Sequence, residues 1–323
     1  MGASQTTNIL LETGTNEVEI LELFIEEEGY RGYYGVNVAK VLEIIPMPAT
    51  IMRPPHMRDA FAAGIFNHRD KIVTLMDLSI WLGRRRIETT QPKVIITEFN
   101  NMVTAFQVSG VTRIHRATWS DIRPLEGYME NMSDTITGVI ELDNKLVFLL
   151  DLEKAISELN PNLAIANSDP APERRIADET YKPIKVFHAD DSHVIRTSLK
   201  RRLEEAGVFT VESTINGDEA WTHLLEVKRK AAEAEVPIQR FVEIIISDIE
   251  MPGMDGYHLC KRIKDDPELK SIPVVLFSSL ITEKLLHKGE AVGADGQFAK
   301  PDMELIQFMK EEVEKVRQHS QAG

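Results

Sequence analysis

Five polar or charged side chains stand at the ends of predicted strands in the C-terminal part of the chain. In chain order they are Asp190, Asp191, Asp248, Ser278 and Lys300. A single aspartate at such a place is usually a helix cap or a turn residue. In an open α/β sheet, however, the carboxyl ends of parallel strands meet at one edge, where ligands bind. We therefore expect these five side chains to lie close together.

The types of these side chains predict a metal-assisted reaction on an anion. Three carboxylates at one site repel one another unless a hard cation neutralises them. Oxygen ligands without accompanying His or Cys favour Mg²⁺. Lys300 and Ser278 add hydrogen-bond donors for an anion beside the metal. A carboxylate nucleophile, Mg²⁺ and a lysine together predict the formation of an aspartyl phosphate.

Strands and helices alternate along the part of the chain that must position these residues. Strands are predicted at residues 184–189, 209–213, 242–247, 274–278 and 298–299. Helices are predicted to begin near Ser192, Asp218, Gly256, Thr282 and Asp302. Five successive βα units predict an α/β domain with a doubly wound, five-stranded parallel sheet of the flavodoxin-like type.

Four short motifs occur in this part in a fixed order, each after a predicted strand. They read FHADDS, ISDIEMPGMDG, VLFSS and AKP. With them, residues 184–319 resemble the receiver domain of two-component response regulators. The resemblance implies that Asp248 is the phosphoacceptor, and that Ser278 and Lys300 hold the phosphoryl oxygens.

The same resemblance implies a Mg²⁺ site. Asp191 and Asp248 would ligate the ion directly, Asp190 would assist through water, and Glu250 would contribute its backbone carbonyl. One position departs from the family pattern. An aromatic switch residue often stands three positions before the lysine, and Gln297 is found there. We expect switching in this chain not to depend on burial of an aromatic ring at that position.

The N-terminal half contains an internal repeat. Residues 64–82 align without a gap with residues 138–156. Each copy reads as a strand, a polar turn, a second strand and a helix capped by an aspartate, Asp77 in one copy and Asp151 in the other. Two copies of such a unit predict an all-β domain made of two related small barrels.

Other elements of this half are predicted from periodicity. Residues 18–25, 94–99 and 102–108 have the composition of strands. Apolar residues at Val38, Val41, Leu42 and Ile45 recur at the i, i+3, i+4, i+7 spacing, which predicts a short helix.

The first copy of the repeat carries a recognisable signature, GIFNHRDKIVTLMDL. It resembles the CheW coupling domain, and the resemblance covers about residues 8–158. Asp70 replaces the usual Gly of the family pattern, and Thr74 replaces the usual Pro. Arg69 lies at a predicted hairpin tip and would otherwise be a solvated turn residue. By the resemblance it matches the arginine through which that family contacts receptors.

A Pro-rich stretch without apolar periodicity, residues 159–183, is predicted to link the two domains. A CheW-like domain (8–158) followed by a receiver domain (184–319) resembles the CheV family of chemotaxis proteins. The resemblance implies docking to the cytoplasmic tip of methyl-accepting chemoreceptors and to the histidine kinase CheA. It implies an adaptor rather than an enzyme, regulated by phosphoryl groups at Asp248 or draining them.

An alternative is a response regulator with an attached output domain. A methylesterase-type output needs a nucleophile elbow, and a DNA-binding output usually carries a basic helical module. The N-terminal half shows neither pattern. A net charge of −14 also argues against nucleic acid or an anionic membrane as the main partner.

No apolar run is long enough to span a bilayer, so we expect a cytoplasmic protein that associates with membrane receptor arrays and is not inserted itself. The single cysteine, Cys260, is expected to be a buried structural thiol.

Overall fold

The computed structural model describes most of the chain. The described residues are 17–55, 57, 59–99, 102–125, 135–159, 182–279, 281, 283–300, 302 and 304–321. They divide into two compact units, one before and one after residue 161. The predicted linker lies almost wholly outside the described residues, as do Thr282 and Pro301.

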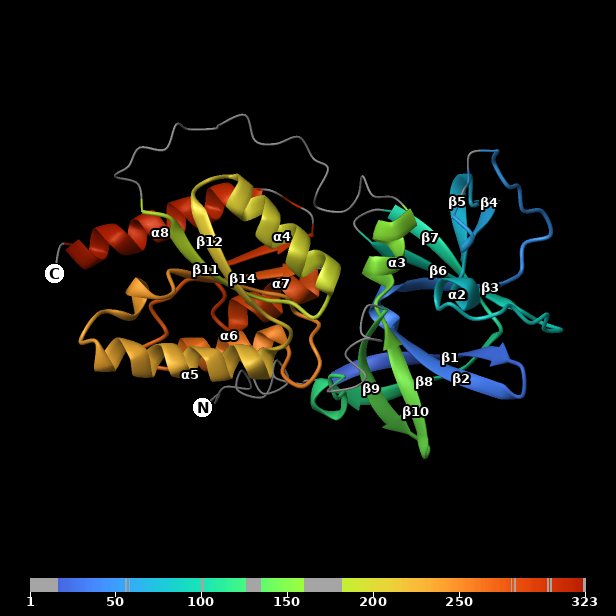
Figure 1. Cartoon of the computed structure of the whole chain (residues 1–323), viewed down its shortest axis with the longest axis horizontal. Helices are drawn as coiled ribbons and strands as arrows, with labels where there is room; N and C mark the ends of the chain where they lie inside the picture. Colours follow the sequence, from blue (N-terminus) through green and yellow to red (C-terminus); the bar gives the residue numbers. More distant parts are fainter. Residues whose placement is uncertain are drawn as a thin grey trace, which may run out of the picture. The chain divides into compact units, whose positions relative to one another are not determined.

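The N-terminal unit consists of two five-stranded sheets (Figure 1). The first sheet has the order β8-β1-β2-β10-β9 and the second the order β3-β6-β7-β5-β4. The strands are β1 (Glu17–Glu27), β2 (Tyr30–Asn37), β3 (Val41–Pro46), β4 (Ala62–His68), β5 (Lys71–Asp77), β6 (Lys93–Phe99), β7 (Met102–Val108), β8 (Gly110–Thr118), β9 (Ile136–Leu142) and β10 (Lys145–Leu150). The helical elements are η1 (Val38–Lys40), α2 (Leu78–Trp81), η2 (Trp119–Asp121) and α3 (Leu152–Leu159). The predicted all-β fold is confirmed.

The internal repeat appears as two copies of a hairpin followed by a helix, β4-β5-α2 and β9-β10-α3. Asp77 Oδ1 accepts a hydrogen bond from Ser79 N at 3.0 Å, and Asp151 Oδ1 accepts one from Lys154 N at 2.9 Å. Both aspartates therefore cap the helices that follow them, as the repeat predicts. One copy lies in each sheet, so the repeat underlies the two halves of the unit.

The predicted short helix around residues 38–45 is wrong. Only the single turn η1 forms, and the chain then continues as strand β3, which pairs antiparallel with β6. Burial alternates residue by residue along β3, with Leu42 and Ile44 on the exposed face. In so short a run the same apolar residues satisfy a helical and a strand spacing. The β-branched residues and the partner strand decide in favour of the sheet.

Three clusters of buried apolar side chains hold the N-terminal unit together. One lies within the first sheet around Ile20, Val147 and Leu149, and a second lies within the other sheet around Phe66 and Val73. The third and largest combines side chains from both sheets with the two helices of the repeat. The two sheets therefore share a core and form one folding unit.

The C-terminal unit is a parallel sheet with helices on both faces (Figure 1). The strand order is β12-β11-β13-β14-β15. The strands are β11 (Ile184–Ala189), β12 (Phe209–Thr214), β13 (Ile244–Ser247), β14 (Val274–Ser278) and β15 (Gly296–Ala299). The helices are α4 (His193–Glu205), α5 (Gly217–Glu233), the turn η5 (Ile238–Arg240), α6 (Gly256–Asp265), α7 (Glu283–Ala291) and α8 (Glu304–Gln321). This confirms the predicted doubly wound fold.

The two faces of this sheet have separate cores. Helices α4 and α8 cover one face, where Leu199 and Met309 pack on even-numbered residues of β11 such as Val186. Helices α5 and α6 cover the other, where Leu224 and Leu259 contribute to a second cluster. Because side chains alternate along a strand, residues 184, 186, 188 and 190 all lie on the α4 and α8 side.

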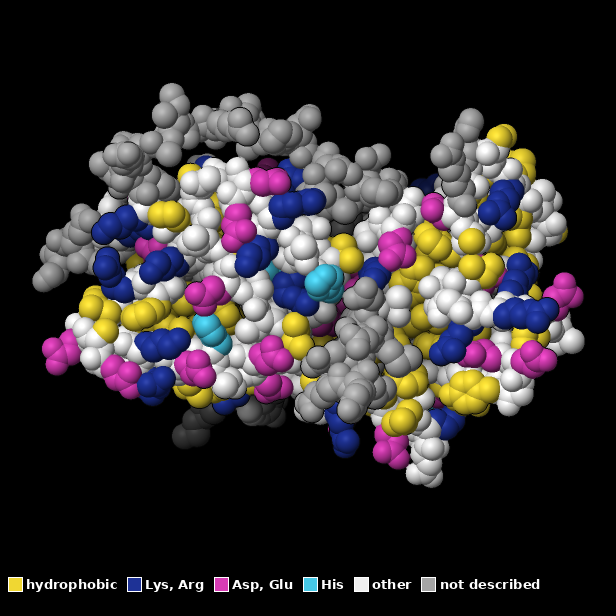
Figure 2. Space-filling model, in the orientation of Figure 1, with side chains coloured by type: hydrophobic (Ala, Val, Ile, Leu, Met, Phe, Trp, Pro, Cys, Tyr) yellow, Lys and Arg dark blue, Asp and Glu magenta, His cyan; other side chains and the backbone are white. Residues whose placement is uncertain are grey.

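The surface carries both signs of charge. On the face drawn in Figure 2, Lys and Arg side chains are interspersed with Asp and Glu over each unit. Of the helices in the described part of the chain, each is too short or too polar to cross a membrane.

Candidate functional site

Three aspartates meet at the carboxyl edge of the parallel sheet. Asp190 and Asp191 follow β11, and Asp248 follows the neighbouring strand β13. One carboxylate oxygen from each lies within 4.8 Å of the other two. Asp190 and Asp248 are buried, whereas Asp191 is half-buried. The structure thus brings together the carboxylates that the sequence placed at separate strand ends.

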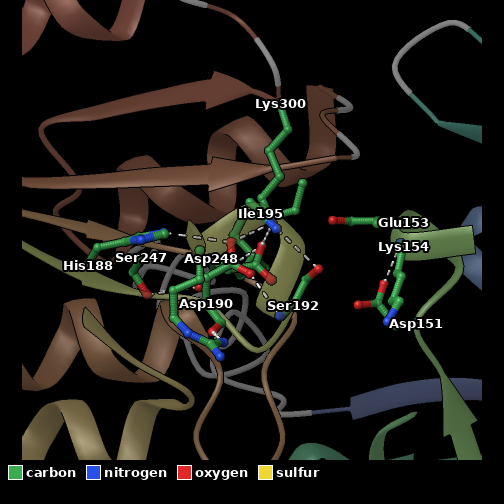
Figure 3. Close-up of polar contacts among 12 residues, drawn as sticks. Asp151, Glu153, Lys154, His188, Asp190, Ser192, Ile195, Ser247, Asp248 and Lys300 are labelled. Atoms are coloured by element: carbon green, nitrogen blue, oxygen red, sulfur yellow. Dashed lines mark hydrogen bonds and ion pairs between the residues drawn. The ribbon is translucent and has the colours of Figure 1, made fainter. Parts of the chain in front are cut away.

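Lys300 places its ammonium between two of these carboxylates. Nζ lies 2.8 Å from Asp190 Oδ2 and 3.1 Å from Asp248 Oδ1 (Figure 3). The side chain is 1% exposed, so the attraction is weakly screened. Burial by itself would raise the pKa of Asp190, but the neighbouring Lys300 and His188 together outweigh it and hold that pKa well below its usual range. Asp190 is therefore an anion throughout the physiological range.

The backbone around Asp190 fixes the direction of its carboxylate. Oδ1 accepts a hydrogen bond from Ser192 N at 2.9 Å, and the carbonyl of Asp190 accepts one from Arg196 Nη1 at 2.7 Å. Ser192 is also the N-cap of α4. The start of that helix therefore positions the carboxylate.

A tight loop after β13 positions Asp248. Its Oδ1 accepts a hydrogen bond from Ile249 N at 2.8 Å, and Gly256 N donates to the Ile249 carbonyl at 3.0 Å. A Cβ on Gly256 would lie 2.0 Å from the Asp248 carbonyl oxygen, so only glycine fits where the loop enters α6. Glu250, expected to offer its backbone carbonyl, is a half-buried residue of the same loop.

Ser278 ends β14 beside Lys300. It is 2% exposed, and its carbonyl accepts a hydrogen bond from Lys300 N at 2.9 Å. The hydroxyl and the ammonium therefore come from adjacent strand ends of the same sheet edge. All the predicted receiver residues belong to this edge and the loop beside it.

The donor set fits Mg²⁺. The side chains that converge offer carboxylate oxygens, which are the ligands this ion prefers, and three of them lie close enough to share one ion. Lys300 already supplies one positive charge to two of these carboxylates. With Mg²⁺ bound beside Lys300, the positive charges would roughly balance the three carboxylates. An anionic substrate would then not be repelled from the site.

Arg69 belongs to the N-terminal unit and lies at the tip of the β4–β5 hairpin, as predicted. Arg69 and Asp70 have φ values of 48° and 62° and form the turn. The Arg69 side chain is 76% exposed, and Nη2 lies 2.7 Å from Glu43 Oε2 on β3. His68 also contacts this carboxylate, at 3.2 Å. The arginine is thus accessible but held toward β3 by an ion pair.

One residue of the site received no role from the sequence. His188 lies in β11, within the FHADDS motif, and is fully buried. Its Nε2 lies 3.7 Å from Asp190 Oδ2. A polar residue two positions before Asp190, inside a predicted strand of the parallel sheet, is the signal that could have identified it.

Comparisons with known proteins agree with this architecture. The CheW-like domain family matches residues 23–160, and the response regulator receiver domain family matches residues 186–310. Chemotaxis protein CheV3 of Helicobacter pylori is 33% identical over 310 residues, which cover 93% of this chain and 95% of that protein. CheV2 of the same organism is 25% identical over 325 residues, which cover 95% and 97%.

Among solved structures, the scaffolding protein TtCheW from Thermoanaerobacter tengcongensis aligns with 42% of this chain and 88% of its own, with 21% identity and a TM-score of 0.38. The relationship to CheV3 extends over nearly the whole of both proteins and includes both domains. The chain therefore belongs to the CheV family of chemotaxis proteins, with a CheW-like domain followed by a response regulator receiver domain.

Proposed function

We propose that this protein is a phosphorylation-regulated adaptor that couples chemoreceptors to the histidine kinase CheA. Its receiver domain accepts a phosphoryl group from the kinase at Asp248, and this modulates the coupling or drains phosphoryl groups from the kinase. The observation that carries the proposal is the contact of the Lys300 ammonium with both Asp190 and Asp248 inside a cluster of three carboxylates. Membership of the CheV family supports the chemotaxis setting.

The domain limits of the proposal are residues 8–158 for the CheW-like domain, 159–183 for the linker and 184–319 for the receiver domain. The family matches at residues 23–160 and 186–310 support this division, as does the separation of the described residues into two units near residue 161.

In the proposed reaction, a carboxylate oxygen of Asp248 attacks the phosphorus of the donor, and the bond from phosphorus to the donor's leaving atom breaks. Asp191, Asp248 and the Glu250 carbonyl would hold Mg²⁺, with Asp190 assisting, and the ion would supply positive charge that neutralises the attacking and transferred oxygens. Lys300 turns from the carboxylates toward the phosphoryl oxygens, and the Ser278 hydroxyl donates to another of them. The chain therefore supplies the nucleophile and the donors, and it needs no separate general base.

The CheW-like domain supplies the coupling surface in this proposal. Arg69 contacts the receptor or the kinase, and its exposed position at a hairpin tip supports that role. The protein works in the cytoplasm at membrane receptor arrays, without binding nucleic acid and without catalysing a reaction on another substrate.

A reconstitution of chemoreceptor, CheA and this protein tests the proposal. Kinase activity is measured with and without a small phosphodonor, for the parent chain and for Asp248→Asn. We expect both proteins to couple receptor and kinase, and only the parent to change its effect when the phosphodonor is added. A chain that never influences the kinase, or a variant that responds like the parent, contradicts the proposal.

A further inference from the structure

His188 lies directly behind the acidic site. It is 0% exposed, and because it stands two residues before Asp190 on β11 its side chain lies on the same face of the sheet. In Figure 3 the imidazole extends from β11 toward the aspartates. Its Nε2 lies 3.7 Å from Asp190 Oδ2. The ring is therefore the neighbour of a carboxylate oxygen that also faces Lys300.

Neither nitrogen of this ring has a hydrogen-bond partner within the described part of the chain. A neutral imidazole carries one N–H donor and one acceptor nitrogen. A buried donor without an acceptor destabilises the fold, and a small rotation of the ring toward Asp190 Oδ2 would give the donor an acceptor.

A neighbouring hydroxyl can fix which nitrogen carries the proton. Ser213 on β12 is paired with His188 in the sheet, and its Oγ is likewise buried without a hydrogen-bond partner in the described part. On the other side, β13 presents the apolar Ile246. A hydrogen bond donated by Ser213 Oγ to Nδ1 would place the remaining proton on Nε2, which faces Asp190.

We propose that His188 is a positioning residue that holds the Asp190 carboxylate through a hydrogen bond donated by its Nε2–H to Oδ2, with Ser213 fixing the tautomer. This rests on the proposed function, in which Lys300 leaves Asp190 to contact the phosphoryl oxygens. His188 is the donor that then remains at Oδ2. It keeps the carboxylate in the direction that serves the metal site after its ammonium partner has turned away.

Mg²⁺ affinity of the full chain, measured by calorimetric titration, tests this role. We expect His188→Leu to weaken Mg²⁺ binding about 10-fold or more, as removal of a partner that orients a metal-site carboxylate does. His188→Gln, whose amide retains a donor at similar reach, should recover most of the affinity. Ser213→Ala should give a smaller loss than His188→Leu. The difference between parent and His188→Leu should grow when beryllofluoride, a phosphoryl mimic, engages Lys300.

A matched control is His223→Leu. This second histidine stacks on Phe187 of the same strand, from the opposite face of the sheet, with ring centroids 4.6 Å apart. Its removal should leave Mg²⁺ affinity unchanged. If His188→Leu folds and binds Mg²⁺ as tightly as the parent, His188 merely fills the core and the proposal is overturned.

Should His188→Leu fail to fold, His188→Asn is compared with His188→Gln, because the shorter amide has a donor that cannot reach Asp190. Equal Mg²⁺ affinities of these two variants also overturn the proposal, whereas tighter binding by the Gln variant supports it. A parent chain that binds Mg²⁺ but is never phosphorylated at Asp248 contradicts the proposed function instead. The two failures are therefore distinguishable.

Discussion

Gln297 on β15 donates a hydrogen bond from its Nε2 to the backbone carbonyl of Leu286 on α7, across 2.7 Å. The amide lies against Gly289, where a Cβ would come within 2.3 Å of it. At the position where receivers often carry an aromatic switch residue, this chain thus has an amide that connects a strand with a helix. The amide already makes its hydrogen bond at the surface, so moving it into an apolar pocket would cost free energy.

We therefore expect phosphorylation to be transmitted through Ser278 and not through residue 297. Ser278→Ala should still be phosphorylated at Asp248 but should lose the phosphorylation-dependent effect on the kinase. Gln297→Ala should keep that effect and lose about 1 kcal/mol of stability, because one hydrogen bond disappears. Kinase activity in the reconstituted complex and urea unfolding measure the two quantities. The reverse pattern, with response lost only in Gln297→Ala, would contradict this account.

Asp248 should be the only stable site of phosphorylation. Incubation with Mg²⁺ and a small phosphodonor should label the parent chain at this residue, and Asp248→Asn should not be labelled. Chelation of Mg²⁺ should also abolish labelling, because the carboxylates then repel the incoming phosphoryl group. Mass spectrometry after borohydride reduction of the acyl phosphate identifies the site. Modification found at Asp190 or Asp191 would show that the roles are assigned wrongly.

Charge reversal at the hairpin tip should weaken assembly without affecting the receiver. Arg69→Glu breaks the ion pair with Glu43, but an exposed pair contributes only about 0.2–1 kcal/mol, so the fold should persist. We expect less receptor and kinase to be retained in a pull-down, with unchanged labelling of Asp248.

Arg116→Glu provides a matched control for that experiment. Arg116 is 84% exposed on β8 of the same unit and pairs with Glu19 at 2.9 Å. The same loss of binding in both variants would indicate a general effect of charge, and unchanged binding by Arg69→Glu would leave Arg69 as an ordinary turn residue.

The two units should fold independently. Each of the five clusters of buried apolar side chains in the described residues consists of residues from one unit only. Fragments 1–161 and 181–323 should therefore each unfold cooperatively in urea, at midpoints close to those of the intact chain. Circular dichroism and tryptophan fluorescence follow the transitions, since Trp81 and Trp119 report on the first unit and Trp221 on the second. A fragment without a cooperative transition would show that its core needs the other unit.

The single thiol should be unreactive in the native protein. Cys260 is 0% exposed on the buried side of α6, and burial raises its pKa to about 12. The thiolate, which is the reactive form, is therefore scarce at pH 8. At that pH a disulfide reagent should modify Cys260 in the native protein only as fast as the structure around α6 opens. In denaturant the same reagent should react with the thiol at once. Rapid native labelling would mean that α6 does not stay packed against the sheet.

The sequence by itself determined which elements form the receiver and which residues converge at its edge. An isoleucine-rich run that ends at Asp248 is typical of a buried strand. Parallel strands bring their carboxyl ends to one edge of the sheet. The repeat around residues 64–82 and 138–156 similarly predicted two related halves of a β domain. These inferences hold because they depend on local pattern and on topology, which are encoded along the chain.

Only the tertiary structure showed the features that depend on contacts between residues distant in the sequence. Strand β3 was mistaken for a helix because its pairing with β6 cannot be seen in residues 38–45 alone. The contact of Arg69 with Glu43, and that of Gln297 with Leu286, likewise join side chains to other elements.

His188 is the clearest case. The sequence shows neither that this residue is fully buried nor that its Nε2 lies 3.7 Å from Asp190 Oδ2. A side chain's environment is set by packing and register between elements. The pattern along one element does not contain it.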